Sequence, residues 1–129
     1  MHESGADFTN TFRRLASVCE GNDDATLIRQ FADTGRFAEW CLHWRARAAR
    51  EKTTPEVQAQ AMRRVNPAFI PRNHRVEAAL KQAITSGDLS GLTTLSKVLA
   101  TPYDDQPEHA EYAEPPPASF GPYRTFCGT

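Results

Sequence analysis

Three cysteines are the candidates for covalent or metal chemistry in this 129-residue sequence, and they lie far apart, at Cys19, Cys41 and Cys127. A secreted disulfide framework has an even and denser set of cysteines, and a zinc site needs closely spaced pairs, which are missing here. The odd count therefore indicates a reducing compartment, and we expect a cytoplasmic protein. Cys19 and Cys41 occupy apolar positions of expected helices, which predicts small buried side chains. Cys127 stands two residues before Thr129, where burial is least expected.

The other polar side chains do not assemble into a recognisable active site. The histidines are scattered, and none pairs with a serine or cysteine in a defensible catalytic triad. No glycine run matches a phosphate-binding loop, and the late acidic residues lack the glycine and alternation of a calcium loop. We therefore expect no catalytic residue, no metal ligand and no cofactor-binding residue in this chain. The residues considered are His2, His43, His74, His109, Asp104, Asp105, Glu108, Glu111 and Glu114.

Aromatic and basic residues gather between residues 37 and 52. Trp40 and Trp44 share a helical face with Phe37, and several arginines follow closely. Such a pattern can stack on single-stranded nucleic acid, but its i, i+3, i+4, i+7 spacing is typical of a packed core face. The formal net charge of −1 gives no general attraction to nucleic acid, and no apolar run is long enough to span a bilayer. We expect a core face with a solvated basic edge, and neither a nucleic-acid nor a membrane partner.

Start and stop signals divide the chain into about six expected helices. Asp7 and the Thr54-Pro55 pair are typical helix starts, Asn66-Pro67 ends a helix, and Gly87 is a typical C-terminal stop. No segment of five or more residues alternates with period two, so the chain is predicted to be all-α. The other expected signals are Gly21-Asn22 as a stop, Asp23 or Asp24 as the start of a short helix carrying Phe31, Gly35 as a break, Asn73 as a cap, and Ser90 to Pro102 as the limits of the last helix.

The composition changes near residue 100. Residues 53–100 carry six basic and three acidic side chains, whereas residues 101–129 carry one basic and five acidic side chains and six of the nine prolines. This change predicts a helical body over residues 1–100 and an irregular, acidic, proline-rich tail over residues 101–129.

Two segments resemble a known family. The first runs from Met62 to Asn73 and is similar to the M-x-x-x-N-P-x-x-x-x-R-N signature late in selenoprotein O family proteins. The second is the tail, in which a P-Y-D-x-Q-P run and a Pro-Pro segment precede a near-terminal cysteine or selenocysteine. In this sequence these parts are Pro102-Tyr103-Asp104-Asp105-Gln106-Pro107, Pro115-Pro116-Pro117 and Cys127. The resemblance covers essentially the whole chain.

The resemblance implies a protein-kinase-like fold, of which this chain is the C-terminal helical part. Members of the family resemble pseudokinases that transfer AMP from ATP to Ser, Thr or Tyr hydroxyls of proteins, with Mg²⁺ or Mn²⁺. Their nucleotide-binding, metal-binding and catalytic residues lie upstream and cannot be placed on this sequence. The implied partners are therefore an upstream kinase-like core of the same protein and, for the whole protein, its protein substrates.

One functional residue carries over from the family. Its near-terminal cysteine forms a disulfide with a cysteine of the core, which implies redox control through Cys127. The family often has tryptophan before the tail glycine, whereas this sequence has Phe120. For Asn66, Pro67, Arg72 and Asn73 we expect a structural role, as a helix stop, a rigid link, an arginine tying segments together and a new cap. The alternative role is direct contact with nucleotide or substrate.

Two functions are favoured over the nucleic-acid binder considered above, which predicts salt-sensitive binding to oligonucleotides. The first is the C-terminal part of a selenoprotein O-type protein adenylyltransferase, without its own active centre. The second is a free-standing helical interaction module without catalysis, whose acidic proline-rich tail engages a partner.

Overall fold

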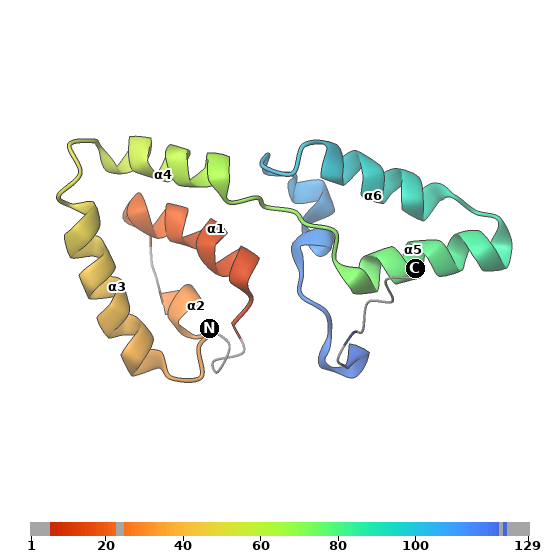
Figure 1. The fold of residues 1–129 in the computed structure, drawn as a ribbon, viewed down its shortest axis with the longest axis horizontal. Helices are drawn as coiled ribbons and strands as arrows, with labels where there is room; N and C mark the ends of the chain where they lie inside the picture. Colours follow the sequence, from red (N-terminus) through yellow and green to blue (C-terminus); the bar gives the residue numbers. More distant parts are fainter. Residues whose placement is uncertain (1–5, 23–24, 122, 124–129) are drawn as a thin grey trace, which may run out of the picture. The chain divides into compact units, whose positions relative to one another are not determined.

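A computed structural model describes residues 6–22, 25–121 and 123 of the chain. Within these residues there are six α-helices and no strand, followed by two short 3₁₀ helices in the proline-rich tail (Figure 1). The prediction of an all-α chain with about six helices and an irregular tail is confirmed. The helices are α1 (Phe8–Cys19), α2 (Ala25–Ile28), α3 (Thr34–Ala48), α4 (Pro55–Val65), α5 (Asn73–Ser86), α6 (Ser90–Ala100), η1 (Pro107–Ala113) and η2 (Ala118–Phe120).

The chain divides into two compact units, residues 1–68 and residues 69–129. The first contains α1 to α4, and the second contains α5, α6 and the tail. The predicted boundary near residue 100 marks a change in composition and stays a prediction. None of the described helices combines the length and the apolar character needed to cross a membrane.

Side-chain caps fix the helix starts of the first unit. Asp7 Oδ1 accepts a hydrogen bond from the Asn10 amide at 2.8 Å, and Thr54 Oγ1 accepts one from the Val57 amide at 3.4 Å, as their positions predict. The expected break at Gly35 is wrong. Asp33 caps α3 in the same manner, and Gly35 lies in the first turn of that helix. The predicted start of α2 at Asp23 or Asp24 lies outside the described residues.

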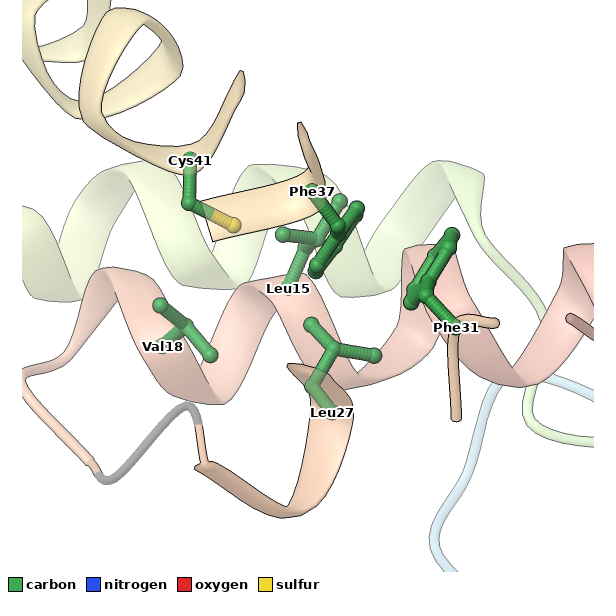
Figure 2. Close-up of a cluster of buried hydrophobic side chains, with 6 residues drawn as sticks. All are labelled: Leu15, Val18, Leu27, Phe31, Phe37 and Cys41. Atoms are coloured by element: carbon green, nitrogen blue, oxygen red, sulfur yellow. The ribbon is translucent and has the colours of Figure 1, made fainter. Parts of the chain in front are cut away.

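The core of the first unit is a cluster of six buried side chains from α1, α2, α3 and the turn after α2 (Figure 2). Phe31 follows the end of α2 instead of lying on it, and its ring stacks on that of Phe37. Trp44 is partly buried against this cluster, but Trp40 remains 43% exposed. The predicted aromatic core face is therefore only partly buried. The cluster consists of Leu15, Val18, Leu27, Phe31, Phe37 and Cys41.

The second unit is a helical hairpin with the tail packed on it. Gly87 has φ +70° and ends α5, as predicted. Gly91 brings α6 close to α5, because a Cβ built there would lie 3.5 Å from the Ala79 Cα. Leu95 and Val98 of α6 are buried, and the η1 segment packs beside that helix.

The expected cap at Asn73 is wrong. Asn73 is the first residue of α5, the cap position belongs to Arg72, and no side chain caps this helix. The tail supplies the hydrogen-bond partner of the Arg72 side chain instead.

Asp88 stabilises the start of α6, because its Oδ1 accepts a hydrogen bond from the Ser90 amide at 2.9 Å. Hydrogen bonds from Ser90 and from Gln82 lower the pKa of the Asp88 carboxyl.

Candidate functional site

The sequence-predicted site residues fall in three places. Asn66 and Pro67 follow α4 in the first unit, whereas Arg72 and Asn73 stand at the start of α5 in the second. Cys127 lies outside the described residues. We therefore consider each group within its own unit.

Asn66 closes the C-terminal end of α4. Its side-chain Nδ2 and its backbone N–H both donate to the Met62 carbonyl, each at 2.9 Å. Arg13 of α1 adds a cation to the same helix end, because its Nη1 donates to the carbonyls of Arg63 and Asn66 at 3.0 and 3.2 Å. A cation at this end complements the helix dipole. The Asn66-Pro67 pair thus ends α4 and is tied to α1.

A second contact joins the same two helices. Both Nη atoms of Arg63 donate to the carboxylate of Glu20, at 2.5 Å each. The Arg63 hydrogen bond lowers the pKa of Glu20. Neither this pair nor the contact of Arg13 is evident from the sequence, because the partners lie 43 to 53 residues away along the chain.

Arg72 joins α5 to the tail. Its side chain is only 7% exposed, and Nη2 donates to the Ala113 carbonyl at 3.0 Å. A buried guanidinium that donates to a backbone carbonyl orders both segments, since an unmade bond there leaves a desolvated polar group. The bond joins the start of α5 to the tail, and the functional role of Arg72 stays a prediction.

Arg75, one turn further along α5, holds the same part of the tail. Its Nη2 donates to the Glu111 carbonyl at 2.7 Å, and its Nη1 lies 3.2 Å from the Glu111 carboxylate. The guanidinium carbon also lies 5.4 Å from the centre of the Tyr112 ring, within range of a cation–π contact. The two arginines, three positions apart, therefore contact three consecutive tail residues, Glu111, Tyr112 and Ala113.

Aromatic contacts continue the attachment further along the tail. The Phe120 ring meets the edge of His74 with ring centres 5.8 Å apart, and it stacks on Tyr123 at the same distance. The Tyr123 hydroxyl donates to Glu77 Oε1 at 2.6 Å, and this bond raises the pKa of Tyr123. The tail is therefore fixed on α5 up to Tyr123, four residues before Cys127.

The two histidines of this region each have a buried ring nitrogen. His74 Nδ1 and His109 Nε2 have no hydrogen-bond partner among the described residues. Burial lowers the pKa of His74, and the positive charges of Arg75 and Arg72 add to the effect. His109 packs edge-on against Tyr112. Both histidines look scattered in the sequence, because nothing local indicates that the tail folds back on α5.

The described cysteines are poorly suited to redox chemistry. Cys41 is 2% exposed. Burial raises the pKa of the Cys19 thiol, the charges of Glu20 and Glu56 raise it further, and its Sγ donates to Gln58 Oε1 at 3.4 Å. Both effects hold the unreactive thiol form.

Metal ligands do not gather in the part of the chain that the structure describes, where no group of three or more His, Cys, Asp or Glu side chains could hold an ion. The hydrogen bonds described above close the end of α4 and attach the tail to α5.

No profile of a known protein family matches the chain. Three similar curated proteins each bear the name protein nucleotidyltransferase YdiU. The protein from a Bradyrhizobium species is 50% identical over 96% of this chain, and those from Rhizobium etli and Syntrophotalea carbinolica are each 48% identical over 100% of it. The chain spans only 25 to 26% of the length of these relatives. This similarity over the whole chain agrees with the resemblance to the selenoprotein O family, and the chain corresponds to about a quarter of such a YdiU protein.

Proposed function

We propose that this chain is the C-terminal helical region of a selenoprotein O-type protein adenylyltransferase. The observation that carries the proposal is the 50% identity over 96% of the chain to a protein nucleotidyltransferase of which it spans 25%. The rest of such a protein, a kinase-like core, would bind ATP with Mg²⁺ or Mn²⁺ and transfer AMP to protein hydroxyls. This chain would stabilise that core, and it would be inactive alone.

The contacts of the described arginines support a scaffolding role. Arg13, Arg63, Arg72 and Arg75 all engage carbonyls or carboxylates of their own unit. Such bonds fix helix ends and tail, and they fit residues that shape a domain.

An assay of the isolated chain tests the proposed lack of activity. The chain is incubated with ATP labelled on its α-phosphate, with Mg²⁺ or Mn²⁺ and a general protein acceptor. We expect no label on protein above the background without chain. Metal-dependent labelling that scales with the amount of chain would refute this part of the proposal.

A size measurement tests whether the chain is part of a longer protein. An antibody against residues 122–129 is used to probe an extract of the source cells. We expect a band several times heavier than the 14.4 kDa of this chain. A band at 14.4 kDa would instead favour the free-standing interaction module.

Exposed apolar side chains keep that second function in consideration. Ile84 is 82% exposed, and Val65, Leu42 and Phe8 are 65 to 71% exposed. Single exposed apolar side chains are normal on protein surfaces, whereas a contiguous patch of them indicates a surface that another polypeptide covers. In the first proposal this polypeptide is the core of the same protein, and in the second it is a separate partner.

We further propose that Cys127 is the redox-active residue of the chain. A disulfide between Cys127 and a core cysteine would form by loss of two protons and two electrons to a small-molecule disulfide, which becomes two thiols. The support is the family position of Cys127, together with the unfavourable surroundings of Cys19 and Cys41.

Alkylation rates test this assignment on the chain itself. With limiting iodoacetamide at pH 7.5, we expect Cys127 to be modified first, Cys19 more slowly and Cys41 last, as followed by peptide mass spectrometry. Cys127→Ser should remove the fast phase, and the control Cys19→Ser should leave it intact. Modification of Cys19 or Cys41 as fast as Cys127 would contradict the assignment.

A further inference from the structure

The contact between the tail and α5 contains a titratable group at its centre. We use tail segment for residues 107–121 and 123, which α5 holds through Arg72, Arg75 and Glu77. His74 stands among these residues and meets the Phe120 ring of the tail segment. A change in the charge of His74 therefore acts directly on the contact.

The surroundings of His74 disfavour its protonated form. From α5, the guanidinium groups of Arg72 and Arg75 face it, and both are positively charged. From the tail segment, the Phe120 ring contacts it, and among the described residues that act on it Glu114 carries the one opposing charge. Its Nδ1 is buried with no acceptor among the described residues, so an added N–H there would be unsatisfied.

We propose that the tail segment and the first turns of α5 form a pH-dependent latch, which is closed while His74 is neutral and opens when His74 takes up a proton. Opening moves Phe120 away from the imidazole, exposes Nδ1 to water, and separates the tail from the two arginines. The latch is a property of the second unit alone, since every group in it lies in residues 69–129.

The sign of the pH effect follows from linkage. Because the closed form lowers the pKa of His74, the open form binds the proton more readily. The closed form is therefore most stable at a pH above the pKa of His74 in the open form, which is about 6.5 for an ordinary histidine. Its stability falls as the pH drops below that pKa. If the closed form stays neutral, the closed-to-open ratio falls by up to about tenfold between pH 7.5 and 5.5.

Among the described side chains of the contact, the histidines are the type that ordinarily changes charge between pH 5.5 and 7.5. The other titratable side chains of the contact are glutamates and tyrosines, and free glutamate and tyrosine side chains titrate near 4.3 and near 10, outside this range. The bond to Glu77 raises the pKa of Tyr123 further from it. His109 is the other candidate in the tail segment, because its Nε2 is also buried without a partner among the described residues. The test must therefore separate the two histidines.

The latch has a consequence for Cys127 that rests on the proposed redox function. Cys127 is the fourth residue after Tyr123, so a closed latch keeps the Cys127 Cα within about 14 Å of the docked Tyr123 Cα. An open latch lifts that limit. Delivery of the thiol to one core cysteine would then be efficient only while His74 is neutral.

Backbone ¹⁵N relaxation of Ala113, Ser119 and Phe120 tests the latch without any reaction of Cys127. We expect these amides to become more mobile between pH 7.5 and 5.5 in the unmodified chain and in the control His43→Gln, whose side chain is exposed on α3. His74→Gln should remove the pH dependence. A His74→Gln chain with the unmodified pH dependence, or a loss of that dependence only in His109→Gln, would overturn the proposal.

A second measurement covers the case in which His74→Gln loosens the tail at every pH. The His74 imidazole is titrated by its own ring signals in the unmodified chain. We expect its midpoint to lie below the ordinary value and to coincide with the midpoint of tail mobility. Different midpoints would overturn the latch, whereas failure of Cys127 to form a disulfide would overturn only the proposed redox function.

Discussion

Arg72→Met removes the charged contact between α5 and the tail and keeps the apolar stem. Arg72 is 7% exposed, and its guanidinium donates to the Ala113 carbonyl at 3.0 Å. Methionine has a similar length and fills the same space without a donor. The substitution therefore tests the hydrogen bond and the charge more than the packing.

The size of the effect follows from the chemistry of this bond. A hydrogen bond from a charged donor contributes about 1.5–3 kcal/mol net. Removing the buried cation also removes its desolvation penalty, which offsets part of this loss of free energy. We expect Arg72→Met to destabilise the docked tail by about 2 kcal/mol, which lowers its docked-to-released ratio by about 30-fold.

Native-state hydrogen exchange measures this change locally. The amides of residues 107–121 and of α6 are compared in the unmodified chain, in Arg72→Met and in the control Arg64→Met, whose side chain is exposed on α4. We expect faster exchange in the tail for Arg72→Met alone. A tail that exchanges within about twofold of the unmodified rate would refute the idea that Arg72 holds it.

Three further predictions concern stability. Leu15→Ala, at a core position 1% exposed, should destabilise the first unit by about 2–5 kcal/mol in urea unfolding followed by tryptophan fluorescence. Gly87→Ala should cost about 1 kcal/mol, because φ is +70° there, whereas Gly35→Ala inside α3 should be neutral or stabilising in thermal unfolding. The Arg63 bond lowers the pKa of Glu20 in the folded state. The bond therefore stabilises the fold at a pH above the pKa of Glu20 in the unfolded state, near 4.3, and this stabilisation is lost as the pH falls through the pKa of the folded state. Urea unfolding at several pH values should therefore show a smaller pH dependence for Glu20→Gln than for the unmodified chain.

Local signals in the sequence predict most of the helices. Asp7, Thr54 and Gly87 act within a few residues of their own position, and each does so as its residue type predicts. The errors at Gly35 and Asn73 are also local in origin. A glycine in a first turn is tolerated when an aspartate caps the helix, and an asparagine caps nothing when the preceding residue takes the cap position.

The candidate site depends on contacts that no local pattern shows. Arg72 meets Ala113, and Tyr123 meets Glu77, across 41 and 46 residues. One weaker signal was present, because residues 53–100 are net basic and residues 101–129 are net acidic. This charge difference favours a tail that folds back on the body, and the Arg75–Glu111 pair is one place where it does so.

The contacts of the signature between Met62 and Asn73 explain why its residues are spaced as they are. Asn66 acts backwards along the chain, on Met62 and with Arg13, and so completes the first unit. Arg72 acts forwards, on Ala113, and so completes the second. The unit boundary lies between them, after Ala68. The order of helix stop, link and anchor along the signature therefore follows the division of the chain into its two units.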